Sequence, residues 1–165
     1  MNLQIREASI EDLESLRELF VEENRFHAQL VPEHVRPTQD VLTRVELEDF
    51  VSSPVQRIFV GDDGDDLLGA IIVKLKEQPA DRWKAARRFG YVDELIVSAN
   101  ARGRGVGSQL MAAARDWLLS KGVRAMELHV WSANVDARQF YEALGMRTLQ
   151  RRMIWDLTES PWMQP

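Results

Sequence analysis

The chain has 165 residues and no cysteine, so a disulfide, a zinc site built from thiolates and a cysteine nucleophile are excluded. Hydrophobic residues make up 45% of the sequence and charged residues 28%, which is typical of a globular protein, and we expect one domain over residues 1–165. The net charge of −5 argues against bulk binding of nucleic acid. The three histidines are scattered, so we expect no metal. Without an apolar run long enough for a membrane span or a signal peptide, we expect a cytoplasmic protein.

Apolar periodicity predicts the secondary structure in chain order. Residues 2–8 alternate as in a strand, and residues 9–26 carry apolar side chains at helical spacing. Ser9 and Asp12 have the spacing of a capping box at the start of that helix, and Thr38 is expected to cap a second helix. The elements expected after it are a hairpin within 57–77, a strand over 90–98, a helix over 107–122, a strand over 123–131, a helix over 133–145 and a strand over 147–157.

The predicted order is therefore β-α-α-β-β-β-α-β-α-β. Residues 69–75 and 94–98 are largely apolar without strict alternation, which is typical of central strands covered on both faces. This pattern predicts an α/β fold, in which a single-domain mixed β-sheet is flanked by helices.

The stretch from Arg102 to Gly107 places three glycines and two arginines directly before a predicted helix. Glycine permits positive φ and leaves no Cβ in the way of a ligand. Successive backbone N–H groups in such a turn can form a nest for an anion, and the helix adds its free N–H groups and its positive dipole end. With the charges of Arg102 and Arg104, this loop is suited to a phosphate or pyrophosphate. A purely structural glycine turn is the alternative interpretation.

Two common phosphate-binding motifs do not fit this loop. A P-loop requires Lys-Ser or Lys-Thr after its last glycine, and neither follows here. The dinucleotide motif G-x-G-x-x-G, begun at Gly103, would need a glycine where Ser108 stands. A nicotinamide-dependent oxidoreductase is therefore disfavoured.

The spacing Arg102-x-x-Gly105-x-Gly107 resembles the [Q/R]-x-x-G-x-[G/A] loop of the GNAT superfamily of N-acetyltransferases. A second stretch, "ANVDARQFYEALGM", resembles the later N-x-x-A-x-x-F-Y-x-x-x-G-[FM] pattern of the same family. The residues that match it are Asn134, Ala137, Phe140, Tyr141, Gly145 and Met146. The resemblance is specific over about residues 90–147 and implies the GNAT fold, with acetyl-CoA as the co-substrate.

The resemblance also implies which residues contact coenzyme A. The loop would bind the pyrophosphate through backbone N–H groups, and the strand before it would place a backbone N–H near the thioester oxygen. The expected cofactor-binding residues are Leu95, Ile96, Val97, Arg102, Gly103, Arg104, Gly105, Val106, Gly107, Ser108, Asn134 and Tyr141. For Asn134, capping of the helix that follows it is an equal alternative.

Two side chains are the candidates for proton transfer. The resemblance places Tyr141 beside the coenzyme A sulfur, where a phenol that keeps its proton at neutral pH can act as general acid. Glu94 is the candidate general base, acting through water, with Asp93 as the second choice, because a carboxylate on a central strand is unusual unless it borders a cleft. The alternatives are a tyrosine that only packs, and a carboxylate held in an ion pair by an arginine of residues 81–88.

The charge distribution favours a cationic acceptor. Residues 1–80 carry 17 acidic and 8 basic side chains, whereas residues 81–165 carry 9 and 13. A polyamine, an aminoglycoside, or a lysine or N-terminal amine of a peptide would suit the acidic half. The side chains expected to border the acceptor are Phe26, His27, Asp93 and Trp131.

The sequence thus predicts an acetyl-CoA-dependent N-acetyltransferase in which a primary amine attacks the thioester directly in a ternary complex. A coenzyme A-binding sensor without catalytic activity is the alternative. The aromatic segment 151–157 is a candidate for pairing across subunits, which would form a homodimer. Neither nucleic acid nor a membrane is expected as a partner.

Overall fold

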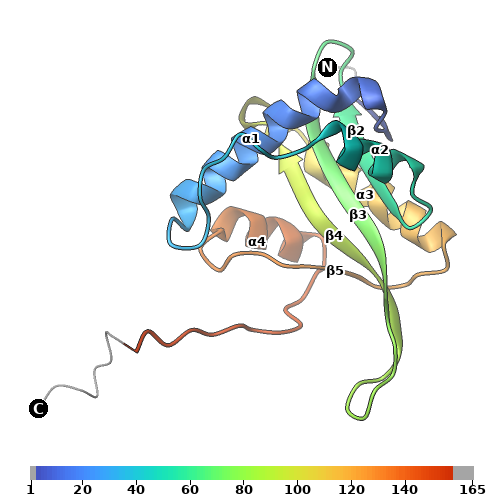
Figure 1. Ribbon diagram of the computed structural model, residues 1–165, viewed down its shortest axis with the longest axis vertical. Helices are drawn as coiled ribbons and strands as arrows, with labels where there is room; N and C mark the ends of the chain where they lie inside the picture. Colours follow the sequence, from blue (N-terminus) through green and yellow to red (C-terminus); the bar gives the residue numbers. More distant parts are fainter. Residues whose placement is uncertain (1–2, 158–165) are drawn as a thin grey trace, which may run out of the picture.

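The computed structural model describes residues 3–157 (Figure 1). Its core is a five-stranded sheet in the order β1-β2-β3-β4-β5, antiparallel except for the parallel pair β4 and β5, so the predicted mixed α/β fold is confirmed. The elements are β1 (Gln4–Glu7), α1 (Leu13–Leu30), α2 (Arg44–Ser52), β2 (Gln56–Asp62), β3 (Leu67–Gln78), β4 (Arg87–Val97), α3 (Val106–Ser120), β5 (Met126–Leu128) and α4 (Val135–Ala143), with 3₁₀ turns at Ile10–Asp12 and Ala99–Ala101. Within residues 3–157, no helix combines the length and apolarity that a bilayer crossing requires.

The side chains of the central strands enter two separate cores. Ile58 and Val60 of β2 pack with Leu16 of α1 and Leu47 of α2, whereas Phe59 between them packs on the opposite face against α3. Successive residues of a strand point to opposite faces, so one continuous apolar run supplies both cores. Figure 1 shows α1 and α2 over one face of the sheet and α3 over the other.

A buried carboxylate fixes the start of the first helix. Asp12 is only 7% exposed and accepts hydrogen bonds from both terminal nitrogens of Arg6, each at 2.8 Å. Arg6 also donates from Nε to Asp62 at 2.9 Å, and the backbone N–H of Ser9 donates to Asp12 at 2.7 Å. The predicted capping box is thus present. Through Arg6, the Asp12 carboxylate also ties the start of α1 to β1 and β2.

The second helix begins later than the sequence predicts. Thr38 does not cap it, because its hydroxyl accepts from the backbone N–H of Asp40, at 3.0 Å, in a turn that precedes the helix. The cap is Thr43, whose hydroxyl accepts from the backbone N–H of Glu46, while the Glu46 carboxylate accepts from the backbone N–H of Thr43 at 2.7 Å. This reciprocal pair satisfies two helix-terminal donors, which explains why the helix starts at Arg44.

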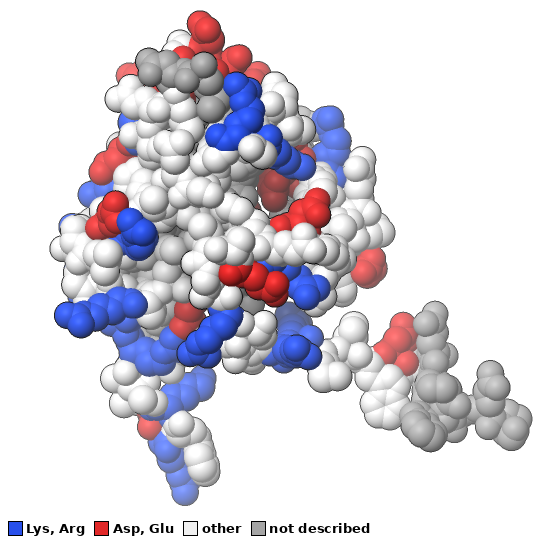
Figure 2. All heavy atoms as spheres, turned by 180° about the vertical axis from the view of Figure 1, so that it is seen from behind, with Lys and Arg blue, Asp and Glu red and all other residues white. Residues whose placement is uncertain are grey.

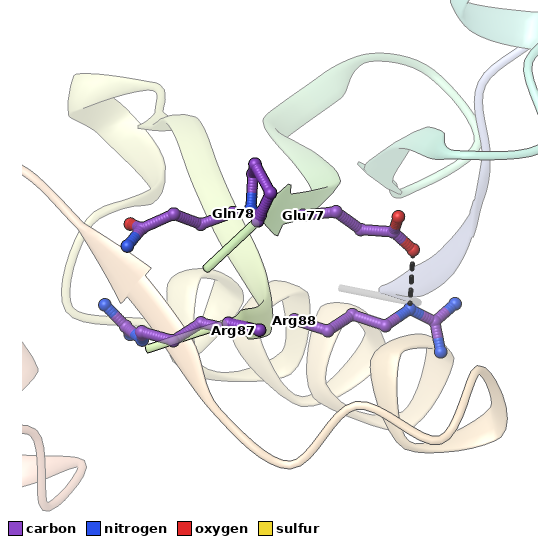
Figure 3. A pocket seen from close by; sticks show the side chains of 6 residues that line it. Glu77, Gln78, Arg87 and Arg88 are labelled. Carbon is purple, nitrogen blue, oxygen red and sulfur yellow. Dashed lines mark ion pairs between the residues drawn. The ribbon is translucent and has the colours of Figure 1, made fainter. Parts of the chain in front are cut away.

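The ends of β3 and β4 form an arm that extends beyond the helices (Figure 1). Glu77 pairs in register with Arg88, and their side chains form an ion pair of 3.3 Å between Oε1 and Nε. A shallow hollow lies on the arm, lined by Glu77, Gln78, Arg87 and Arg88 among others (Figure 3). Figure 2 shows Lys and Arg side chains gathered towards this end of the molecule.

The strand predicted over residues 147–157 is not formed. These residues carry no strand, and Figure 1 shows the segment leading away from the sheet. Met153 and Ile154 are 91% and 83% exposed. An apolar segment becomes a strand only when its backbone groups pair with a neighbouring strand, and this segment leaves the sheet after α4 instead of returning to β5. The predicted pairing with a second copy stays a prediction.

Replacing Asp12 with asparagine should lower the free energy of unfolding by about 1.5–3 kcal/mol, because charge-assisted hydrogen bonds are lost at a buried position. The hydrogen bond from Arg6 holds the pKa of Asp12 below its usual value. The advantage of the wild type should therefore be complete at neutral pH and be lost as the pH falls through that lowered pKa. Urea unfolding at neutral and acidic pH measures both effects.

The matched control is Asp116→Asn, which removes an exposed carboxylate paired with Arg115. That variant should cost about 0–1 kcal/mol, because solvent screens an exposed ion pair. Equal losses in the Asp12 and Asp116 variants would contradict the role given to the buried cluster.

Candidate active site

The candidate site lies where β4 separates from β5. Parallel pairing between the two strands stops at Val92, opposite Leu128. At the same place the register of β4 against β3 slips between Val92 and Glu94, so Asp93 is the extra residue of a β-bulge. Beyond the bulge this edge of β4 pairs with no other strand of residues 3–157. A cleft of about 860 Å³ opens there.

Most of the predicted site residues line this cleft. They come from α1, from β4, from the glycine loop and the start of α3, from the segment after β5 and from α4. The predicted residues that line it are Phe26, His27, Asp93, Glu94, Leu95, Val97, Arg102, Gly103, Gly105, Val106, Gly107, Ser108, Trp131, Asn134 and Tyr141.

Two predicted residues do not line the cleft with their side chains. Ile96 is 1% exposed and packs in the core shared with α1 and α2. Arg104 stands between Gly103 and Gly105, both of which have positive φ, and its side chain is exposed. In the turn between β2 and β3, hydrogen bonds from the backbone of Asp66 and Asp65 lower the pKa of Asp63, and the charge of Arg104 adds a smaller contribution. Of the two loop arginines, only Arg102 therefore reaches the cleft.

The glycine loop has the backbone geometry of an anion nest. Gly103 has φ of 72° and Gly105 has φ of 82°, in the left-handed region that favours glycine. Gly105 is the N-cap of α3, so the first N–H groups of the helix, from Val106 onwards, have no partner within the helix. These donors and the positive end of the helix dipole face the cleft side of the loop, which suits a phosphate.

Arg102 and Glu22 hold the glycine loop against α1. Arg102 donates from Nε to the carbonyl of Val97 at 3.0 Å, and its guanidinium lies 5.4 Å from the ring centre of Phe26. The Glu22 carboxylate accepts from the backbone N–H of Ala99 at 2.7 Å. These contacts fix α1 as one wall of the cleft.

Tyr141 lies in the cleft on α4, in contact with the core formed with α3. Burial, and then the negative charges of Glu23 and Glu94, raise its pKa to about 12. The phenol therefore keeps its proton throughout the physiological range and is able to donate it. Asn134 caps the same helix, because its side-chain oxygen accepts from the backbone N–H of Ala137 at 3.1 Å.

Glu94 and Asp93 differ in their partners. The Asp93 carboxylate forms an ion pair with Lys74 on β3, so its charge already has a partner. Glu94 makes no ion pair with the described part of the chain, and the arginines of the arm pair elsewhere, Arg87 with Glu127 for example. The side chain of Glu94 lines the cleft, with protein around it. Desolvation by this protein, followed by the charge of Asp93, raises the pKa of Glu94.

Glu23 is a cleft residue that the sequence analysis missed. Its side chain is 14% exposed, and desolvation, followed by the charge of Glu94, raises its pKa to about 7. His27, one helical turn later, has Nε2 at 3.4 Å from Oε1 of Glu23, and burial lowers the pKa of that histidine. The helical spacing of the sequence could have identified Glu23, because it precedes Phe26 and His27 by three and four residues and so shares their helix face.

The loop after α1 closes over the same region. His34 stacks on Trp131, with ring centres 5.3 Å apart and planes 11° from parallel, and Val35 lines the cleft. Within residues 3–157, no group of three or more Asp, Glu or His side chains is arranged to hold a metal ion.

Comparison with known proteins points to one family. A sequence model described as the acetyltransferase (GNAT) family matches residues 13–146. N-alpha-acetyltransferase 30 of Schizosaccharomyces pombe is 32% identical over 93 residues, which cover 56% of this chain and 59% of that protein. The matched segments span between 24% and 59% of the lengths of five curated relatives, so this chain corresponds to only part of them.

Solved structures share the fold. A variant of the BH1408 protein from Bacillus halodurans superposes with a TM-score of 0.88 at 25% identity, covering 93% of this chain and 99% of that one. The aminoglycoside N-acetyltransferase AAC(6')-Iy, solved with a bisubstrate analogue containing CoA, gives a TM-score of 0.70 at 20% identity, covering 94% and 98%.

The raised pKa of Tyr141 can be measured directly, because the chain has two tyrosines and Tyr91→Phe leaves one. In that variant the ultraviolet absorbance of the phenolate should appear only near pH 12, about two units above an ordinary phenol. Adding Glu23→Gln should lower the midpoint, because one of the opposing negative charges is removed. Adding Glu18→Gln, an exposed position on the same helix, should leave it unchanged. A midpoint near that of free tyrosine would contradict the burial of the phenol.

Proposed function

Because the chain belongs to the acetyltransferase (GNAT) family, we propose that it is an N-acetyltransferase that moves the acetyl group of acetyl-CoA to a primary amine. Both substrates would be bound at once, and the amine would attack the thioester directly. The observation that carries this proposal is that one cleft contains an anion nest, the phenol of Tyr141 and the carboxylate of Glu94, which forms no ion pair within residues 3–157. These groups suit the reaction, since the nest can hold a phosphate and the two side chains can move protons.

Acetyl-CoA is the proposed co-substrate. The pyrophosphate would bind to the backbone N–H groups of the glycine loop, with Arg102 nearby, and the pantetheine arm would follow β4 towards Tyr141. A protein of this fold holding a CoA-containing analogue supports the same ligand class here. The proposed contacts are made by Leu95, Ile96, Val97, Arg102, Gly103, Arg104, Gly105, Val106, Gly107, Ser108, Asn134 and Tyr141, with Ile96 and Arg104 contributing backbone groups.

The free edge of β4 is the proposed positioning element. A backbone N–H in residues 95–97 would donate to the thioester oxygen as negative charge develops on it, which is how a fixed donor stabilises a transition state. Holding the amine against the thioester supplies about 7–11 kcal/mol of the barrier reduction. Most of the proposed rate enhancement therefore comes from placement, and proton transfer supplies a smaller part.

The proton transfers are assigned to Glu94 and Tyr141. As the C–N bond forms, the nitrogen loses a proton, which Glu94 takes through a water molecule. When the C–S bond breaks, the coenzyme A thiolate takes the proton of Tyr141, and the phenolate regains a proton before the next turnover. The raised pKa of Glu94 makes it a better base. The raised pKa of Tyr141 keeps the phenol protonated but makes it a weaker acid, so its proton moves only as the basic thiolate forms.

The proposed acceptor is a small cationic amine or an amine of a peptide. Phe26, His27, Asp93 and Trp131 line the part of the cleft that α1, β4 and the segment after β5 contribute. Two of the similar proteins are named as an N-alpha-acetyltransferase and as an aminoglycoside N-acetyltransferase, and both names describe transfer of an acetyl group to nitrogen. A coenzyme A-binding sensor is the alternative function, and it shares the nucleotide site without the chemistry.

A thermal-shift titration with acetyl-CoA, coenzyme A, ATP and NAD tests the cofactor. At one hundred times its dissociation constant, a ligand adds about 2.7 kcal/mol, which for a domain of this size is a rise of roughly 5–10 °C in Tm. We expect this rise with the two coenzyme A species alone. A rise with ATP or NAD alone would contradict the assignment of the loop.

Replacing Tyr141 with phenylalanine should lower kcat by about 10–100-fold or more, because the leaving thiolate loses its proton donor. The thermal shift with acetyl-CoA should remain, which separates chemistry from binding. Tyr91→Phe is the control, since it removes the other phenol of the chain. Thiol release measured with a panel of amines gives the rates. Equal turnover by the Tyr141 variant and the wild type would contradict its role as acid, and binding without transfer to any amine would favour the sensor.

A further inference from the structure

The mechanism above leaves open how a protonated amine becomes able to attack. A primary amine is mostly an ammonium ion at neutral pH, and it must lose one proton before its nitrogen has a lone pair to offer. Glu94 was assigned the second proton, which leaves as the C–N bond forms. A group in the cleft that binds the ammonium and takes the first proton would supply this step.

Glu23 lies in the right part of the cleft for this task. It is on α1, whereas Glu94 is on β4, so the two carboxylates line the same cleft from different walls. The hydrogen bond from the N–H of Ala99 to Glu22, the neighbouring residue, holds this part of α1 to the chain directly after β4. The position of Glu23 relative to Glu94 is thus fixed by the fold.

In the part of the chain that the structure describes, Glu23 has no permanent cationic partner at close range. His27 is a close neighbour, and its Nε2 lies 3.4 Å from Oε1 of Glu23. Burial lowers the pKa of His27, so its ring is neutral at neutral pH and does not neutralise a carboxylate. Within residues 3–157, no lysine or arginine forms an ion pair with Glu23, and Arg102 acts on it only as a more distant charge.

We propose that Glu23 and Glu94 together form the ammonium site of the acceptor, and that Glu23 takes the first proton from the bound amine. The inference rests on the proposed acetyltransferase function and assigns its substrate class, an amine that enters the cleft as a cation. A cation between two carboxylates relieves the repulsion between their charges, which an uncharged acceptor cannot do.

The proton balance is complete with these residues. The ammonium gives one proton to the Glu23 carboxylate and becomes a neutral amine, which attacks the thioester carbon. The second proton passes from nitrogen to Glu94, the C–S bond breaks, and the thiolate takes the proton of Tyr141. One of the two protons then restores Tyr141 and the other goes to water, so each turnover yields an amide, coenzyme A and one proton.

The electrostatics of Glu23 agree with this role. Desolvation is the main cause that raises its pKa to about 7, the charge of Glu94 adds to it, Arg102 opposes it, and Glu22 has a smaller effect. A carboxylate with that pKa is ionised often enough near neutral pH to bind an ammonium, and basic enough to accept its proton. The negative charge of Glu23 also acts on Tyr141 of α4, where it contributes to the raised pKa of the phenol.

The test compares Glu23→Gln with Glu18→Gln, an exposed position one turn earlier on the same helix. Spermidine, kanamycin and a peptide with a free N-terminus are the protonated acceptors, and hydroxylamine, which is unprotonated at neutral pH, is the uncharged one. With the best protonated acceptor, Glu23→Gln should lower kcat/KM by about tenfold or more. With hydroxylamine it should stay within about twofold of the wild type. The thermal shift with acetyl-CoA should be unchanged in both variants.

The pH dependence provides a second readout. For the wild type, kcat/KM with the protonated acceptor should fall as the pH drops through about 7, because protonated Glu23 can neither bind nor deprotonate the ammonium. The part of this limb that is centred near pH 7 should be absent in Glu23→Gln, in which Glu94 is the remaining base. Carbon-13 NMR of glutamate carboxyls should show one group titrating near pH 7 that disappears in Glu23→Gln and moves to lower pH in Glu94→Gln.

The outcomes separate this inference from the function on which it rests. If the wild type binds acetyl-CoA and acetylates an amine, but Glu23→Gln keeps its rate and its acidic limb, the role of Glu23 is overturned and the acetyltransferase remains. An equal loss with hydroxylamine would also overturn it, since the effect would not depend on the charge of the acceptor. Without a thermal shift or transfer by the wild type, both proposals fail.

Discussion

The parallel pairing of β4 with β5 ends at Val92, and a bulge at Asp93 follows in the ladder with β3. A strand with partners on both edges has no backbone groups left for a ligand, whereas β4 beyond this point has one open edge. The bulge also shifts the alternation of side chains by one residue. Asp93 and Glu94, which are consecutive, therefore both line the cleft instead of pointing to opposite faces of the sheet. The cleft and its carboxylates depend on this one irregularity.

Desolvation is the common cause behind the chemistry of the cleft. It is the largest contribution to the raised pKa of Glu23, of Glu94 and of Tyr141. Removing water disfavours every charged form, so the carboxylates become better bases while the phenol keeps its proton. Lys74 and Arg102 oppose this effect, and both are engaged by other groups, Lys74 by Asp93 and Arg102 by the carbonyl of Val97. Burial in the cleft thus raises the pKa of all three groups.

The distribution of charge along the chain is a weak guide to where a charged ligand binds. Many bases of the second half lie on the β3–β4 arm, at the end of the molecule where Figure 2 shows Lys and Arg gathered, and not in the cleft. Arg104 likewise has an exposed side chain that does not line the cleft. What the cleft offers an anion is mainly backbone N–H groups at Gly103, Gly105 and the start of α3, together with Arg102. Local geometry, and not the sum of charges, distinguishes this site.

The sequence by itself determined the fold class, the family, the glycine loop and the capping box at Ser9, because these depend on local spacing and on backbone preferences that neighbouring residues fix. It did not reveal Glu23, the bulge at Asp93 or the ion pair that separates Asp93 from Glu94, and it predicted a strand over 147–157 that the structure does not form. Those features were decided only by the tertiary structure. Pairing between strands, the approach of α1 to β4 and the loss of solvent at a side chain all arise from residues far apart in the chain, and no local pattern encodes them.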